Sequence, residues 1–124
     1  MLSLRLIGYW RNEQRPELPD PHDFVDLSWD ESERREVAGY LDAGFVPWAA
    51  AGFSPCRICG VLNGSVERTD WTYLWPEGLG HYVVEHSVRL PREVLDHITT
   101  RLDEVQSRDS INDSWWLTVR PEQT

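Results

Sequence analysis

Hydrophobic and polar positions recur along this chain with two different periods, and each period predicts its own kind of element. Apolar residues recur at helical spacing after Pro91, which suits the first turn of a helix; they are Val94, Leu95, Ile98, Leu102 and Val105. A second helix is predicted from about residue 29 to 43, because Ser28 and Glu31 form a capping-box pattern and Gly44 is a stop signal. Each helix has one apolar side, which we expect to face the core.

Alternation of apolar and polar residues predicts short strands in the rest of the chain. The predicted strands are residues 2–10, 45–53, 71–75 and 115–119. In the third, the rings of Trp71, Tyr73 and Trp75 would share one face, which we expect to be core, with a ligand-binding aromatic surface as the alternative. The elements predict an α+β fold: a small, twisted, mainly antiparallel sheet with two or three helices. No linker or repeat divides residues 1–124, so one domain is expected.

Two cysteines and two histidines have a spacing that suits one metal ion. Two residues separate Cys56 from Cys59, twenty-one separate Cys59 from His81, and four separate His81 from His86. Two thiolates and two neutral imidazoles fill the tetrahedral shell of zinc. The sequence therefore predicts a structural zinc ion bound by these four residues, within a zinc-binding unit at 54–90.

The unit is expected to run from a cysteine turn through a hairpin to a helix that carries both histidines. Gly60 would let the chain leave the turn, and Asn63-Gly64 is the preferred dipeptide of a two-residue hairpin. Pro76 would lie in the first turn of the helix. Residues five apart lie about 140° apart around an ideal helix, so both imidazoles reach one ion only if the last turn distorts near Ser87.

Three alternatives to this site stay open. Glu85 lies about 40° from His81 on the helical wheel and could replace His86 as the fourth ligand. The cysteines could instead be buried thiols, a redox pair or a disulfide. A site with three protein ligands, in which Glu77 or Glu85 acts as general base on a bound water, would be a zinc-dependent hydrolase.

Charge narrows the choice of partner. The net charge is −9, and residues 16–50 hold nine acidic residues and two arginines, whereas residues 51–92 are neutral. Nucleic-acid binding needs clustered cations, so this balance argues against it. The acidic region is interpreted as a solvated surface, with a docking surface for a basic protein as the alternative. The chain has no apolar run of about 18 residues, so no membrane span is expected. It shows no export signal either, so a cytoplasmic location is expected.

Several short motifs carry a resemblance that covers most of the chain. They are Cys56-Arg57-Ile58-Cys59-Gly60, Asn63-Gly64, Thr69-Asp70, Trp75-Pro76-Glu77-Gly78-Leu79, His81-Tyr82-Val83, His86, Val88-Arg89-Leu90-Pro91 and, earlier, Asp20-Pro21, Phe24-Val25-Asp26 and Ser28-Trp29-Asp30. Together they resemble a family of small uncharacterised bacterial proteins, which implies a cytoplasmic domain with a zinc site and implies no activity. The chain departs from the pattern at Trp71, where a glycine is usual. The spacing is also similar to the two-cysteine, two-histidine zinc finger, whose surface is basic.

Taken together, these features lead us to expect a non-catalytic, zinc-stabilised protein-binding module with a basic protein partner. An immunity or antitoxin-like protein, or a regulatory accessory protein, would fit that description. The alternatives are the zinc-dependent hydrolase and, with less support, a zinc-finger-like nucleic-acid-binding protein.

Overall fold

A computed structural model describes residues 3–49, 52–107 and 112–122. In chain order the elements are β1 (Arg5–Leu6), the 3-10 helix η1 (Pro21–Phe24), α1 (Glu31–Asp42), β2 (Glu67–Thr69), β3 (Tyr73–Pro76), α2 (Leu79–His86), α3 (Arg92–Gln106) and α4 (Ser114–Leu117). The central strand β3 pairs with β1 in parallel and with β2 antiparallel, so the sheet is mixed. The predicted α+β class is confirmed.

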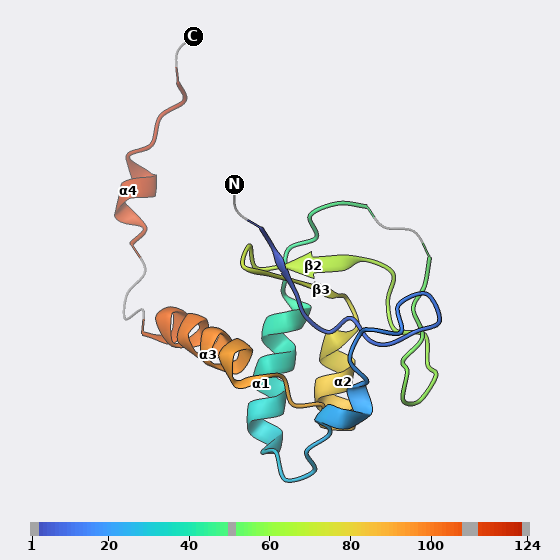
Figure 1. Ribbon diagram of the computed structural model, residues 1–124. Helices are drawn as coiled ribbons and strands as arrows, with labels where there is room; N and C mark the ends of the chain where they lie inside the picture. The colour runs from blue at the N-terminus through green and yellow to red at the C-terminus, as the bar shows by residue number, and fades with distance from the viewer. Residues whose placement is uncertain (1–2, 50–51, 108–111, 123–124) are drawn as a thin grey trace.

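Helices α1 and α2 pack next to each other on one side of this small sheet. Figure 1 shows α1 and α2 side by side below the strands, and α1 also packs against α3. The core between these elements is rich in large side chains; it includes Trp10, Trp29, Leu41, Tyr73, Trp75, Leu79, Val83, Val88, Val94 and Ile98. No helix in the described segments combines the length and the apolar character needed to cross a membrane.

The first long helix begins slightly later than its capping-box pattern predicts. The residue that caps α1 is Asp30, whose carboxylate accepts a hydrogen bond from the amide of Glu33 at 3.0 Å. Ser28 instead donates its hydroxyl to Asp26 at 2.6 Å, in a local turn before the helix. Ser28 and Asp30 both have side chains that can cap a helix, and in the structure Asp30 is the cap.

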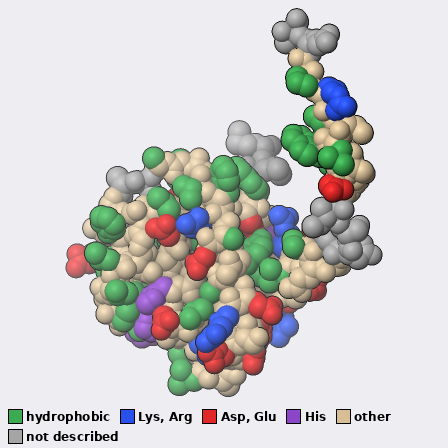
Figure 2. Space-filling view, turned by 180° about the vertical axis from the view of Figure 1, so that it is seen from behind, with side chains coloured by type: hydrophobic (Ala, Val, Ile, Leu, Met, Phe, Trp, Pro, Cys, Tyr) green, Lys and Arg blue, Asp and Glu red, His purple; other side chains and the backbone are tan. Residues whose placement is uncertain are grey.

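The predicted closing strand at 115–119 is wrong. The chain there forms the short helix α4, because its backbone amides bond to nearby carbonyls. The amide of Thr118 donates to the carbonyl of Trp115, and the amide of Val119 donates to the carbonyl of Trp116. These bonds occupy groups that a strand would offer to a neighbour. Figure 1 and Figure 2 show α4 apart from the body, and the side chains of Trp115, Trp116 and Leu117 are exposed.

The predicted strand at 45–53 is reduced to one bridge, in which Phe45 pairs with Thr69. Two residues interrupt the rest: Pro47 has no amide to donate, and Gly52 has a positive φ of 89°. Residues 50 and 51 of this prediction lie outside the described segments.

Only two of the three rings expected on one strand face are core. Tyr73 and Trp75 are 4% and 1% exposed, and the indole of Trp75 donates to the carbonyl of Leu41 at 3.1 Å. Trp71 lies in the turn before β3 with φ 73°, and its exposed ring lies beside that of Phe45, with the ring centroids 5.2 Å apart. The departure from the glycine pattern at Trp71 therefore falls at a position whose conformation favours glycine.

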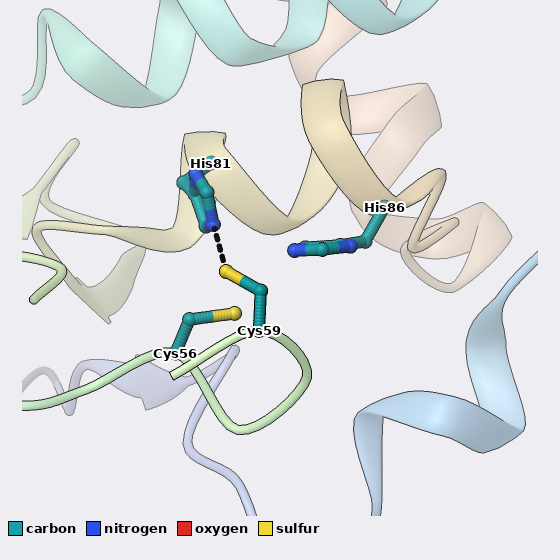
Figure 3. Close-up of side chains that lie close together, drawn as sticks. All are labelled: Cys56, Cys59, His81 and His86. Carbon is teal, nitrogen blue, oxygen red and sulfur yellow. Dashed lines mark hydrogen bonds between the residues drawn. The ribbon is translucent and has the colours of Figure 1, made fainter. Parts of the chain in front are cut away.

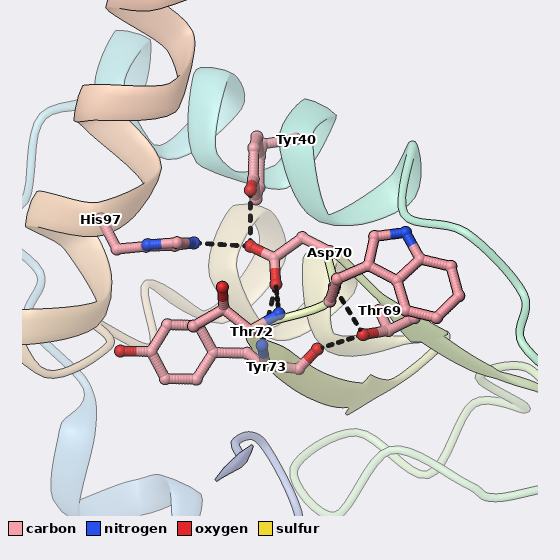
Figure 4. A network of polar contacts seen from close by, with 7 residues as sticks. Tyr40, Thr69, Asp70, Thr72, Tyr73 and His97 are labelled. Carbon is pink, nitrogen blue, oxygen red and sulfur yellow. Dashed lines mark hydrogen bonds and ion pairs between the residues drawn. The ribbon is translucent and has the colours of Figure 1, made fainter. Parts of the chain in front are cut away.

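The turn between β2 and β3 is fixed by the carboxylate of Asp70 (Figure 4). One oxygen accepts hydrogen bonds from the hydroxyl of Tyr40 at 2.6 Å and from Nε2 of His97 at 2.7 Å. The other accepts the amides of Thr72 at 3.0 Å and Tyr73 at 2.8 Å. One side chain thus ties the hairpin to both α1 and α3, and His97 has a structural partner far from the cysteines.

This carboxylate predicts a loss of stability in acid. Burial alone would raise the pKa of Asp70, but the hydrogen bonds from Tyr40, His97 and the turn amides lower it below the ordinary value of 3.8. A lowered folded-state pKa stabilises the protein above 3.8, and that stabilisation is lost as the pH falls through the folded value.

Urea unfolding at pH 7 and pH 3 measures this effect, and D70N is the matched variant because its amide does not titrate in this range. We expect the difference between the two pH values to be smaller in D70N than in the wild type. An equal difference in both proteins would contradict the assignment.

Candidate metal centre

The cysteine turn is closed by its own backbone. The amide of Cys56 donates to the carbonyl of Val61, and the amide of Gly60 donates to the carbonyl of Cys56, both at 2.8 Å. Gly60 has φ 78°, as expected for the residue by which the chain leaves the turn. The amide of Ile58 points at Sγ of Cys56 at 3.4 Å, a contact that stabilises a thiolate.

The hairpin encloses this turn and does not follow it. Pro55 and Leu62 form an antiparallel bridge, and the amides of Ser54 and Asn63 bond across to the carbonyls of Gly64 and Ser54. Asn63-Gly64 therefore lies in an arm of the hairpin, and the prediction of a two-residue turn there is wrong. The closed loop at 56–60 already reverses the chain, so a second reversal is not needed.

The helix that carries both histidines starts after the proline predicted to open it. Pro76 is the last residue of β3, and the following amide, of Glu77, still bonds to the carbonyl of Val66 at 2.9 Å. That pairing keeps the chain extended, so α2 begins at Leu79 with Gly78 as its cap.

The last turn of α2 departs from ideal helical geometry at the place where the spacing requires it. His86 is the final helical residue, and Ser87 follows in the left-handed region with φ 53°. The amides of Ser87 and Val88 both donate to the carbonyl of Tyr82, which widens and closes the turn. The expected distortion near Ser87 is confirmed.

The four predicted ligand atoms lie together, all within 4.8 Å of one another. Sγ of Cys59 and Nε2 of His81 are 3.4 Å apart, and the rings of His81 and His86 are 5.0 Å apart. Bond lengths of zinc to sulfur and nitrogen give tetrahedral edges of roughly 3.3–3.8 Å, so the cluster is close to the size of a zinc shell. Figure 3 shows both cysteines facing the two imidazoles, one sulfur from each side of the loop. The cluster can hold a metal ion.

The structure bears on two of the alternatives to this site, Glu85 as the fourth ligand and a disulfide between the cysteines. Glu85 is exposed and is not part of the cluster that the described residues form, and the two cysteines are free thiols, not a disulfide. Neither His22 nor His97 belongs to the cluster. His22 contacts Asp20 at 2.7 Å, and His97 bonds to Asp70 in the turn between β2 and β3.

Burial points to a missing partner at His86. Its Nε2 atom is buried and has no hydrogen-bond partner among the described residues. Burial, with the nearby His81 adding to it, lowers the pKa of His86, which keeps the imidazole neutral. A neutral imidazole has the lone pair that a metal needs, and a buried unpaired nitrogen is costly, so a bound ion would satisfy this atom.

No family model, curated protein or solved structure matches this chain. The resemblance to small bacterial proteins therefore stays a prediction. What the centre can do is argued from its geometry.

A tyrosine that the sequence did not single out for this purpose supports the cysteine loop. The hydroxyl of Tyr82 accepts the amide of Arg57 at 2.7 Å, joining α2 to the loop between the two cysteines. Burial raises the pKa of Tyr82 to about 12, so the phenol stays neutral at ordinary pH. Its only sequence signal was its place directly after His81, on the buried side of α2. Such outer contacts orient metal ligands and are part of the site.

Proposed function

We propose that this protein is a non-catalytic module stabilised by one zinc ion, and that it binds a protein partner. One observation carries the zinc assignment: two sulfur and two nitrogen donors converge within 4.8 Å, and His86 has a buried nitrogen without a hydrogen-bond partner in the described part of the chain. Thiolate and imidazole donors favour zinc over calcium and magnesium, which prefer oxygen.

The donor count supports a structural role for the ion. Four protein ligands leave no coordination position for a reacting water. The ion would join the loop at 54–64 to α2, and that loop contributes Cys56 to the buried core, with Ile58 partly buried against it. A segment with so little apolar burial gains its fixed position from the metal in place of packing.

The protein partner is supported by charge. The net charge of −9 and the acidic residues at 16–50 give the protein a field that attracts basic proteins and speeds their encounter. In α1 the exposed residues include Glu31 and Glu36; Glu31 pairs with Arg35 at 2.7 Å, and Glu36 has no ion pair within the described segments. A basic partner fits an immunity or antitoxin-like protein or a regulatory accessory protein.

Cobalt substitution tests the structural role against the hydrolase alternative. Co²⁺ bound by two thiolates and two imidazoles should show sulfur-to-cobalt charge transfer and the visible bands of a tetrahedral site. Added azide should leave these bands unchanged, since no ligand position is open. Bands that shift with azide would show an open position and favour the zinc-dependent hydrolase.

A further inference from the structure

A cavity of about 280 Å³ lies next to the metal loop. It is bounded by the chain at 8–12, by the segment at 52–57, and by residues at the ends of β2 and β3. Four aromatic residues line it, Tyr9, Trp10, Phe53 and Tyr82; of these, Phe53 is exposed and Trp10 and Tyr82 are buried. Its size suits one side chain of a partner and is near the lower end of ligand pockets.

Two carboxylates line the cavity, and they differ in the contacts they already make. Glu77 is fully engaged, because one oxygen accepts the amide of Ser65 at 2.9 Å and the other faces Arg68 at 3.4 Å. Glu67 accepts the indole N–H of Trp48 at 3.0 Å on Oε2, and the hydroxyl of Tyr9 is a second neutral donor beside it. No cation pairs with Glu67 among the described residues, so this carboxylate has capacity for one charged group.

The aromatic wall and this carboxylate together favour a cation. Ring faces carry negative potential, and a guanidinium or ammonium over them is attracted. Burial raises the pKa of the Tyr9 phenol, and the negative charge of Glu67 and a hydrogen bond to this carboxylate raise it further. Among the described residues that line the cavity, the one cation is Arg57, which is exposed. The protein as a whole has a net charge of −9. An anion would face both this net field and two carboxylates.

We propose that this cavity receives an arginine side chain of the basic partner, with its guanidinium paired to Glu67 and stacked on the aromatic wall. Arginine suits the site better than lysine because its flat group stacks on rings and is less strongly hydrated. The inference rests on the proposed function for the existence of a protein partner, and the carboxylate and aromatic residues that carry it lie outside the metal cluster.

The probe is N-acetyl-arginine amide, and N-acetyl-citrulline amide is its neutral counterpart of nearly the same shape. Both are titrated at low salt into the protein as purified, followed by two-dimensional NMR. We expect saturable shifts at Trp10 and Tyr82 with the arginine probe and about tenfold weaker binding of citrulline, as for loss of one charged hydrogen bond. Equal binding of the two probes, or no binding of either, would overturn the proposal.

Two glutamine variants test whether the charge of Glu67 is the one that binds the arginine probe. E67Q keeps an acceptor for Trp48 and is expected to weaken arginine binding about tenfold. E85Q removes the same charge from the exposed side of α2, outside this cavity, and should bind as the wild type does. Equal weakening in both variants would mean a non-specific field effect and would overturn the site.

Zinc content measured on the same samples keeps the metal proposal separate. A zinc-loaded protein without a preference for arginine would overturn only the cavity proposal. Arginine binding by a protein without zinc would overturn only the metal proposal.

Discussion

Replacing Cys56 with serine is expected to release the metal and to destabilise the fold strongly. The side chain is 2% exposed and accepts the Ile58 amide, so its sulfur is the most buried of the ligand groups. A ligand that binds only the folded state contributes about 4 kcal/mol when its free concentration exceeds its Kd about a thousandfold. We expect C56S to lose about that amount relative to the zinc-loaded wild type.

Zinc analysis combined with urea unfolding measures both effects. The wild type treated with a chelator should unfold at nearly the stability of C56S, because both lack the same cross-link. H22N is the matched control, since the exposed ring of His22 pairs with Asp20 and is not one of the four cluster residues, so the change should leave zinc content and stability unchanged. A C56S protein that keeps wild-type stability and its zinc would contradict the ligand assignment.

The second large effect is expected at the hairpin turn, from D70A. The side chain of Asp70 is 8% exposed and accepts four hydrogen bonds, which join three separate elements. Its removal leaves the hydroxyl of Tyr40, the ring of His97 and two amides without their acceptor. Unsatisfied groups of this kind cost about 1–3 kcal/mol each when buried, so we expect a loss of about 3 kcal/mol after partial rehydration.

Urea unfolding of D70A and D96A separates this network from a general charge effect. Asp96 is an exposed carboxylate on α3 beside His97, and its removal should change stability by less than about 0.5 kcal/mol. Zinc content should stay at the wild-type level in both variants, since the turn does not contact the cluster residues. Similar losses in the two variants would show that the network is not the cause.

Features encoded within one stretch of chain could be predicted from the sequence. The α3 helix follows the spacing of Val94, Leu95 and Ile98, all buried, because its periodicity is a property of the segment alone. The four donors also come together as their spacing predicted, down to the irregular last turn of α2. In that case the turn geometry and the helix fix the donor positions locally.

Features that depend on distant partners could not be predicted. Trp115 and Leu117 alternate as a strand would, yet a strand also requires an edge to pair with, and their backbone bonds locally instead. The three residues of the Asp70 network, Tyr40, Asp70 and His97, lie 27 or more positions apart, and no spacing rule links them. Competition between equal local signals explains the remaining difference at α1, where two candidate caps were available.

The central claim is that one zinc ion joins the cysteine loop to α2 through two sulfur and two nitrogen atoms. X-ray absorption at the zinc edge of the purified protein tests it most directly. The expected spectrum shows two sulfur atoms at about 2.3 Å and two nitrogen atoms at about 2.0 Å from the metal. A protein that contains no zinc, or zinc surrounded by oxygen atoms without sulfur, would contradict it.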